Sequence, residues 1–317
     1  MIKTNSLLFA ALLATSPAFA ADGDHWLTDF KAAKAQAAAQ KKDLLVDFTG
    51  SDWCHFCIKL DDEVFSQEEF KTEAPKNYVL VKIDFPQDTS SQSEELQKQN
   101  QALQEKYPIQ GYPTVFLMDA QGRPYAQTGY QPGGAKDYLP HLKELQKAKT
   151  ERDAAFAEAE KAEGIAKAKS LVKGLSAVAS ELHGHYEGVT KMILDSDPGD
   201  ETGFKALQDR ATARMDLEKA YVAAMRAGES DKAITAIDAF LKEHKMEGEE
   251  LQQTLAMKID PLINAERYDD ALATLEQIKT AAPDTEMGQL AVAFEEKLKA
   301  MKAEAEAKKE GEAKAEE

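Results

Sequence analysis

Trp53-Cys54-His55-Phe56-Cys57 follows the apolar run Leu44-Leu45-Val46-Asp47-Phe48, and this order of residues indicates how the first half of the chain folds. The apolar run is typical of a strand that is covered on both faces, and a helical pattern begins at the first cysteine. Free backbone N–H groups and the helix dipole at such a terminus favour a thiolate over a thiol. Because the thiolate is the attacking species in disulfide exchange, we expect Cys54 to attack and Cys57 to resolve.

The chain has only these two cysteines. A bridge across three positions closes a very small loop and adds little stability, so the pair is more plausible as a reactive than as a structural disulfide. The alternative of a zinc half-site needs two further ligands, and the paired histidines, His183 and His185, lie in the helical half of the chain. We therefore expect a redox pair, with no metal and no cofactor.

Short apolar runs alternate with helical patterns from Trp26 to about Gln146. This alternation predicts an α/β sandwich, with a mixed sheet flanked by helices. The expected strands are 44–48, 78–83, 114–118 and 124–129. The expected helices are 30–40, 58–72, 93–107 and 135–147.

After Lys147 no strand pattern returns, and residues 148–301 are expected to form an all-α domain. The segments 228–237 and 266–275 look alike, and their equivalent residues Ala233 and Ala271 lie 38 positions apart. This period resembles that of tetratricopeptide helix pairs over 204–301, although two units are few and a plain helical bundle stays open. Residues 302–317 are expected to be a charged tail, either a frayed helix or disordered.

The N-terminus has the pattern of a signal peptide over residues 1–20. Lys3 precedes an apolar stretch, and Ala18-Phe19-Ala20 offers a cleavage site. The alternative is a membrane anchor, but the apolar stretch is shorter than the roughly 20 residues that span a bilayer. We expect an exported protein, periplasmic or secreted, with no membrane span after cleavage. The 39 basic and 56 acidic residues give a net charge of −17, which argues against nucleic acid as a partner.

Val46-Asp47-Phe48, Trp53-Cys54-His55-Phe56-Cys57 and Gly111-Tyr112-Pro113-Thr114 together resemble thioredoxin. The resemblance spans about residues 25–147, so we place a thioredoxin-like domain at 21–147. It implies a cis Pro113 that packs against the disulfide, and a Tyr112 backbone that pairs with an extended substrate. It also implies that Trp53 lines the site.

The resemblance further implies that Asp47 is the buried acid that accepts a proton from Cys57. The alternative for Asp47 is a strand-end carboxylate bound to neighbouring backbone. Thr49-Gly50-Ser51-Asp52 is one residue longer than the usual connection, which puts the place of this acid in doubt.

The dipeptide between the cysteines also departs from classical thioredoxin, since His55-Phe56 replaces Gly-Pro. A histidine at this place is typical of oxidising or isomerising members. Its ring cation would stabilise the Cys54 thiolate and raise the reduction potential. Lys59 either adds to this positive field or is a plain surface cation.

The sequence thus predicts a thiol–disulfide oxidoreductase that acts on exported proteins, with its direction open between reductase, oxidase and isomerase. Its expected partners are protein thiols and disulfides and an unidentified redox partner. The alternative is a helical-repeat interaction or assembly protein with a secondary redox centre. In either case the helical half is a candidate for protein docking or dimerisation, and turnover of the cysteine pair discriminates between the two.

Overall fold

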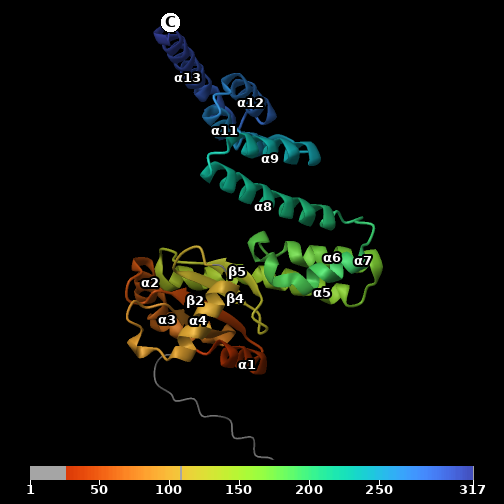
Figure 1. The fold of residues 1–317 in the computed structure, drawn as a ribbon. Coiled ribbons are helices and arrows are strands. Elements are labelled where there is room, and N and C mark those ends of the chain that lie inside the picture. Colours follow the sequence, from red (N-terminus) through yellow and green to blue (C-terminus); the bar gives the residue numbers. More distant parts are fainter. Residues whose placement is uncertain (1–25, 108, 317) are drawn as a thin grey trace, which may run out of the picture. The chain divides into compact units, whose positions relative to one another are not determined.

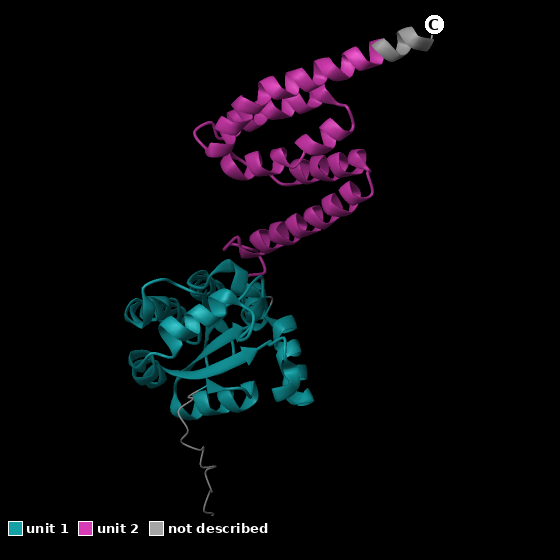
Figure 2. Cartoon of the chain, turned by 90° about the vertical axis from the view of Figure 1, so that its left-hand side faces the viewer, with its two compact units in different colours: residues 1–196 teal, residues 197–317 magenta. Residues whose placement is uncertain are grey.

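The computed structural model describes residues 26–107 and 109–316. The predicted signal peptide, residues 1–20, lies outside the described residues. The chain divides into two compact units, residues 1–196 and 197–317 (Figure 2), and each is described by itself. None of the helices in the described part of the chain combines the length and apolar character needed to cross a bilayer.

Unit 1 is built on a five-stranded mixed sheet (Figure 1). The strand order is β1-β3-β2-β4-β5; β3 runs parallel to β1 and β2, whereas β4 is antiparallel to β2 and β5. The predicted mixed sheet is therefore confirmed, and the two-residue β1 was not expected. The strands are β1 (Trp26–Leu27), β2 (Asp43–Thr49), β3 (Tyr78–Asp84), β4 (Thr114–Met118) and β5 (Pro124–Thr128).

Helices cover both faces of this sheet, as the buried strand runs predicted. On one face, Phe30 of α1 (Phe30–Gln40) contacts Tyr107, which follows α4 (Glu94–Lys106), at 6.1 Å between ring centroids. On the other face, Phe70 of α3 (Glu68–Asn77) lies 6.5 Å from Tyr138 of α5 (Gly134–Ala159). The central strand β2 is buried from Leu44 to Thr49 because both faces are covered.

The helix expected at 58–72 is divided in two. The chain forms α2 (His55–Leu60), continues as one wide π turn, η1 (Asp61–Phe65), and starts again as α3. Two side chains accompany the break: Ser66 Oγ donates to Asp61 Oδ2 at 3.0 Å, and Gln67 Nε2 donates to the Asp62 carbonyl at 2.6 Å. Polar side chains that bond to nearby backbone and carboxyl groups compete with continued helix, which periodicity alone does not reveal.

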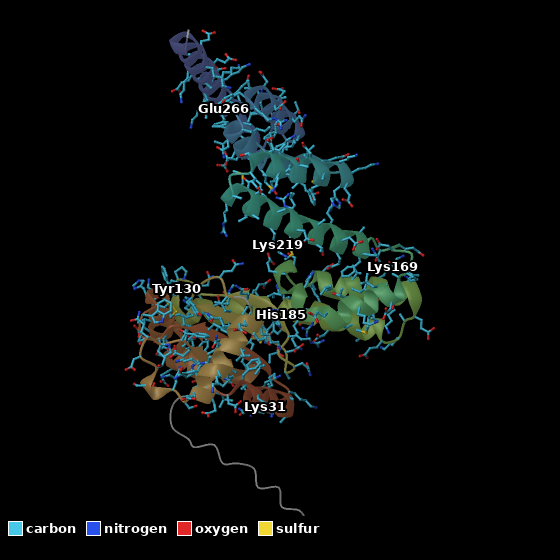
Figure 3. All side chains as sticks on the ribbon, viewed as in Figure 1. Lys31, Tyr130, Lys169, His185, Lys219 and Glu266 are labelled. Carbon is cyan, nitrogen blue, oxygen red and sulfur yellow. A yellow bond between two sulfur atoms is a disulfide. The ribbon has the colours of Figure 1, made fainter. Side chains whose placement is uncertain are left out.

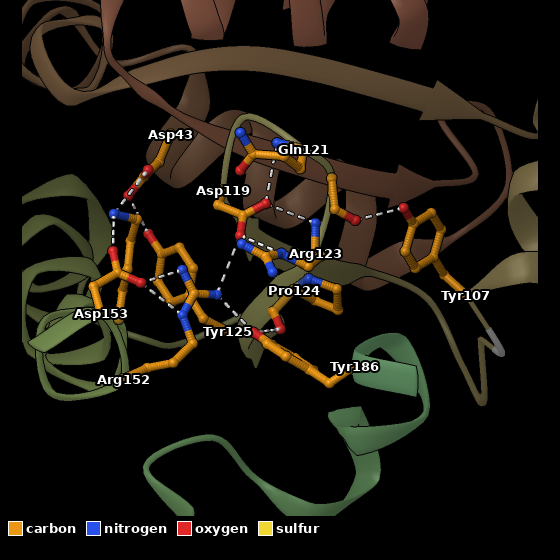
Figure 4. Close-up of polar contacts among 12 residues, drawn as sticks. Asp43, Tyr107, Asp119, Gln121, Arg123, Pro124, Tyr125, Arg152, Asp153 and Tyr186 are labelled. Carbon is orange, nitrogen blue, oxygen red and sulfur yellow. Dashed lines mark hydrogen bonds and ion pairs between the residues drawn. The ribbon is translucent and has the colours of Figure 1, made fainter. Parts of the chain in front are cut away.

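Helix α5 runs on to Ala159, beyond the expected end at 147, and carries a buried arginine back to the sheet (Figure 4). Arg152 is 1% exposed and lies 3.3 Å from Asp119 Oδ2. Arg152 Nη1 donates to the Tyr186 hydroxyl at 2.6 Å, and that hydroxyl donates to the Pro124 carbonyl at 2.9 Å. A buried guanidinium requires such partners, so this network ties α5 and the segment around Tyr186 to the end of β4 and the start of β5.

The helices of unit 1 that follow α5 pack on it and on each other. They are α6 (Gly164–Ser176), η3 (Ser180–Tyr186) and α7 (Glu187–Ser196). Residues 148–196 therefore belong to the same compact unit as the sheet, and the units divide after Ser196 rather than at Lys147, where the composition changes. Both histidines of this region have other contacts: the His183 ring lies 2.8 Å from the Val178 carbonyl, and the centre of the His185 ring lies 4.8 Å from that of Tyr107 in a tilted arrangement.

Unit 2 is helical throughout its described residues, which confirms the all-α prediction for this half. The look-alike segments end in α9 and α12, and their equivalent alanines, Ala233 and Ala271, are both fully buried. The charged tail is helical up to Glu316, as part of α13, and the tetratricopeptide resemblance stays a prediction. The helices are α8 (Phe204–Arg226), α9 (Ser230–Glu243), α10 (Gly248–Ala256), α11 (Ile259–Asn264), α12 (Tyr268–Ala281) and α13 (Glu286–Glu316).

Candidate functional site

The two cysteines lie where β2 ends and α2 begins, and they form a disulfide. Cys54 is the N-cap residue of α2, and its Sγ accepts the Cys57 backbone N–H at 3.2 Å. Cys54 is 7% exposed and Cys57 4% exposed, so the predicted difference in exposure between them is small in the disulfide form. In the reduced form, the same N–H and the helix terminus would stabilise negative charge on Cys54.

Hydrogen bonds anchor the connection from β2 to Cys54 on the last residue of β3 and on the segment that follows it. Asp84 accepts hydrogen bonds from Ser51 N at 3.0 Å and Ser51 Oγ at 2.6 Å. Asp52 accepts the Gln87 N–H at 2.9 Å and the Asp88 N–H at 3.1 Å, and these donors lower the pKa of Asp52. The longer connection noted in the sequence is therefore anchored at two carboxylates.

Trp53, directly before Cys54 in the chain, forms an aromatic wall with Tyr112 and Phe85. The Trp53 ring lies 5.6 Å from that of Tyr112 in an edge-to-face arrangement, and its Nε1 donates to the Phe85 carbonyl at 2.7 Å. The ring centres of Phe85 and Tyr112 are 5.7 Å apart, and Gln104 Nε2 donates to the Tyr112 hydroxyl. Sequence reasoning named Trp53 and Tyr112 and missed Phe85.

Pro113 follows Tyr112 through a cis peptide bond, the isomer that the resemblance implies. Gly129, directly after β5, comes so close that a side chain on it would meet the Pro113 carbonyl at 2.9 Å. The chain after β5 is thus a near neighbour of the Pro113 segment. This proximity depends on strand order, which the local sequence does not contain.

Tyr130, in that same chain after β5, is a site residue that sequence reasoning missed. Figure 3 labels it at the end of unit 1 where α2 lies. Its ring is 5.6 Å from the ring of Phe56, which stands between the two cysteines. Lys59 Nζ lies 4.9 Å from the centre of the Tyr130 ring, so the Lys59 cation packs over this ring. The Tyr130 hydroxyl and Glu63 raise the pKa of Lys59.

Asp47 is a buried acid in the middle of β2. It is 3% exposed, and its Oδ1 has no hydrogen-bond partner among the described residues. Burial raises the pKa of Asp47 to about 7; Lys82, opposite it in β3, opposes this shift, and Asp61 and Asp84 add to it. A carboxyl group with this pKa exchanges protons near neutral pH.

His55 is exposed, and its ring packs 5.3 Å from Phe56. It is thus next to Cys54 in the chain with its imidazole open to solvent. Its tuning role stays a prediction, as do the catalytic roles assigned to Cys54, Cys57 and Asp47.

Residues 30–146 match the family of the thioredoxin-like domain. The chain is 39% identical over 102 residues to the disulfide bond reductase DsbH of Chlamydia pneumoniae, covering 32% of this chain and 61% of that protein. It is 30% identical over 122 residues to the thiol:disulfide interchange protein DsbD of Pseudoalteromonas atlantica, covering 38% of this chain and 19% of that protein. A solved DsbH oxidoreductase aligns at 35% identity and a TM-score of 0.38, over 43% of this chain and 92% of the other.

The chain thus spans about three fifths of the DsbH protein and about one fifth of DsbD. The segment that matches the family contains both cysteines, Pro113 and the strands from β2 to β5. Residues 30–146 are a thioredoxin-like domain.

Proposed function

We propose that this protein is a thiol–disulfide oxidoreductase that reduces disulfides in exported proteins. The observation that carries the proposal is the Cys54–Cys57 disulfide at the N-terminus of α2. Two sulfurs at a helix terminus, one of which accepts a backbone N–H, form a dithiol that can give up two electrons. Among the three directions that the sequence left open, the name of the DsbH relative, a disulfide bond reductase, favours reduction.

The reaction begins with the reduced pair. The Cys54 thiolate attacks one sulfur of a client disulfide, the client S–S bond breaks, and a mixed disulfide forms between Cys54 and the client. The first client sulfur leaves as a thiolate and takes up a proton. Cys57 then attacks Cys54 Sγ, which restores the disulfide and releases the second client sulfur. Two electrons and two protons pass to the client, and a dithiol donor must reduce the pair again.

Asp47 is proposed to accept the proton of Cys57 as that sulfur becomes a nucleophile. Its pKa of about 7 leaves it about half ionised at neutral pH, so it can take and return a proton during one cycle. The burial that sets this pKa also excludes water from the carboxyl group. His55 is proposed to stabilise the Cys54 thiolate from the solvent side.

The test is reduction of insulin by the protein, with dithiothreitol as the dithiol donor. The increase in turbidity as reduced insulin precipitates measures the rate. We expect turnover by the parent protein and none by Cys54→Ser, because that variant lacks the attacking sulfur. Cys57→Ser should accumulate mixed disulfides, visible on non-reducing gels, because resolution is blocked. Equal rates for the parent and Cys54→Ser would contradict the proposal.

Export is part of the same proposal and depends on residues 1–20. The N-terminal sequence of protein recovered from the periplasm or medium should begin at Ala21. An uncleaved N-terminus beginning at Met1 in the cytoplasm would contradict it. The periplasmic or secreted location and the unidentified redox partner follow from export, because reduction of exported proteins requires electrons delivered to that compartment.

A further inference from the structure

The cysteine pair lies between two groups of aromatic side chains. The first is the wall of Trp53, Tyr112 and Phe85 described above, and the second is the contact between Phe56 and Tyr130. Phe85 follows β3 and Tyr130 follows β5, and β2 and β4 lie between these two strands in the sheet. Three strand spacings amount to roughly 14 Å, so the two groups approach the disulfide from different directions.

Charged side chains hold the Tyr130 ring in place. The Tyr130 hydroxyl donates to Glu63 Oε2 at 2.7 Å, and Lys59 Nζ lies 3.6 Å from Glu63 Oε1 and 4.9 Å from the centre of the Tyr130 ring. Lys59 and Glu63 come from one continuous helical segment, α2 and η1, one turn apart. The phenol is thus bonded at its tip and covered on one face, which restricts its rotation.

The backbone on either side of Tyr130 is also confined. A side chain on Gly129 would meet the Pro113 carbonyl at 2.9 Å, and one on Gly134 would meet the Glu63 carbonyl at 3.3 Å. Gly134 has φ of +71°, a conformation that residues with a side chain rarely adopt. Tyr130 therefore stands on a short, closely packed segment between the Pro113 strand start and η1.

Large apolar side chains remain exposed around a disulfide that is itself nearly buried. Phe56 is 53% exposed, Trp53 44% and Ile58 41%, and all three lie within four positions of Cys54. Exposed apolar groups gathered at a reactive centre indicate a surface that is covered during the reaction. A client must bring its sulfur to Cys54, so its neighbouring residues are what can cover these groups.

We propose that Tyr130, held by Glu63 and Lys59 against Phe56, is a specificity-determining residue that favours client disulfides flanked by aromatic or large aliphatic side chains. This inference rests on the proposed function and names the substrate class of that site. The side chain beside the client cysteine packs on Phe56 and Tyr130, while Trp53 covers the other side. Glu63 and Lys59 are positioning residues, since they act through the Tyr130 ring.

The test compares two disulfide-linked peptide dimers, Gly-Phe-Cys-Phe-Gly and Gly-Ser-Cys-Ser-Gly, as substrates of the reduced protein. The parent should prefer the Phe-flanked dimer about tenfold in kcat/KM, mostly through KM. Tyr130→Ala should reduce that preference to about twofold, whereas Tyr130→Phe keeps the ring and should keep most of it. Glu63→Ala should lie between them, because the ring stays but loses its anchor.

Met192→Ala is the matched control. Met192 is 40% exposed on α7 and lines a hollow with Arg123. Arg123 precedes the start of β5, whereas Tyr130 follows the end of that strand. This variant should keep the parental preference. Met192→Ala should also keep the parental rate on a small aromatic-free disulfide, oxidised glutathione, and in Tyr130→Ala that substrate measures the part of the loss that is common to all substrates. The reduction potential of the cysteine pair should be the same in Tyr130→Ala as in the parent. A preference that survives Tyr130→Ala, or an equal loss on all three substrates, would overturn the inference.

Binding separates this inference from the proposed function. In the Cys54→Ser, Cys57→Ser background, NMR titration with the reduced peptides should give tighter binding for the Phe-flanked peptide, and Tyr130→Ala should reduce the difference in affinity to about twofold. If the parent turns over neither dimer nor insulin, the proposed function fails, while this titration still decides the role of Tyr130. If the protein that retains Tyr130 bound both peptides equally, the inference would be overturned.

Discussion

Cys54 and Cys57 occupy unequal places at the start of α2, although both are nearly buried. Cys54 Sγ accepts the Cys57 N–H and caps the helix, so its thiolate is stabilised where it forms. We expect iodoacetamide to alkylate Cys54 about tenfold or more faster than Cys57 in the reduced protein at pH 7, because the helix terminus favours the Cys54 thiolate. Peptide mass spectrometry over time measures both rates. Equal rates would remove the assignment of attacking and resolving sulfur.

Asp47 couples the stability of unit 1 to pH. Its pKa rises from 3.8 in a free chain to about 7 when buried, so the fold favours the neutral acid. Its contribution is most favourable below pH 3.8 and is lost progressively as pH rises to about 7. Asp47→Asn removes the charge and should raise the free energy of unfolding at pH 8 by a few kcal/mol, with about 4 kcal/mol as an upper bound, and much less at pH 4.

Urea unfolding at both pH values measures this difference. Asp52→Asn is the control with the opposite sign, because the Gln87 and Asp88 N–H groups lower the Asp52 pKa. Asp52 therefore contributes stability above the pKa of a free aspartate and loses it as pH falls through its own lower pKa. An Asp47→Asn protein that gains equally at pH 4 and pH 8 would contradict the buried-acid assignment.

At the scale of elements, helix α5 links the redox domain to the helices that follow. Arg152, in the last third of this helix, contacts Asp119 after β4 and Tyr186 at the end of η3. Lys149 lies 3.8 Å from Asp43 at the start of β2, so a second cation on α5 also faces the sheet. These contacts explain why the first compact unit continues to Ser196, although its last strand ends at residue 128.

Arg152→Ala should lower the free energy of unfolding by about 3 kcal/mol, because it leaves buried partners without their cation. Tyr186→Phe is the matched control: it removes one hydroxyl that bonds to Arg152 and the Pro124 carbonyl, and should cost about 1–2 kcal/mol. Chemical unfolding of both variants, monitored by tyrosine and tryptophan fluorescence, gives the two values. A larger loss in Tyr186→Phe than in Arg152→Ala would contradict the central place of the guanidinium.

At the level of the whole molecule, the division into two compact units places the end of the first unit at Ser196, whereas the change in composition places it near Lys147. A chain that ends at Lys147 lacks Arg152 and Tyr186 and should unfold at markedly lower temperature. A chain that ends at Ser196 keeps them and should reduce a small disulfide at the parental rate. Thermal unfolding and a glutathione assay on both shortened chains test this, and equal stability of the two would contradict it.

Residues 197–317 are proposed to select protein clients or a redox partner, or to assemble the enzyme. The Ser196-terminated chain should then reduce insulin more slowly than the full chain, although both act equally on oxidised glutathione. Sedimentation distinguishes the two roles. Loss of a dimer on shortening supports assembly, whereas two monomers with different insulin rates support recognition. Equal rates and unchanged association state would contradict both.

The strands from β2 to β5, the mixed sheet and the helical second half could all be predicted from local sequence patterns. Strands covered on both faces leave continuous apolar runs, and helices leave a three-to-four residue period, so both signals are local. It also predicted the cysteine pair, Trp53 and the Tyr112–Pro113 step, because these residues lie in short motifs. The break between α2 and α3 was missed because it depends on single polar side chains at Ser66 and Gln67.

The residues that reach the site from distant parts of the chain, and the end of the first unit, could not be predicted and follow from the fold. Phe85 and Tyr130 reach the site because the ends of β3 and β5 lie at the same sheet edge as the end of β2. Nothing in the sequence distinguishes Arg152 from other helical arginines. In the fold its side chain is buried, with 1% of its surface exposed, and contacts Asp119. The raised pKa of Asp47 likewise comes from burial between helices and neighbouring strands. Such contacts join residues far apart in the chain, and local patterns carry no record of strand order or burial.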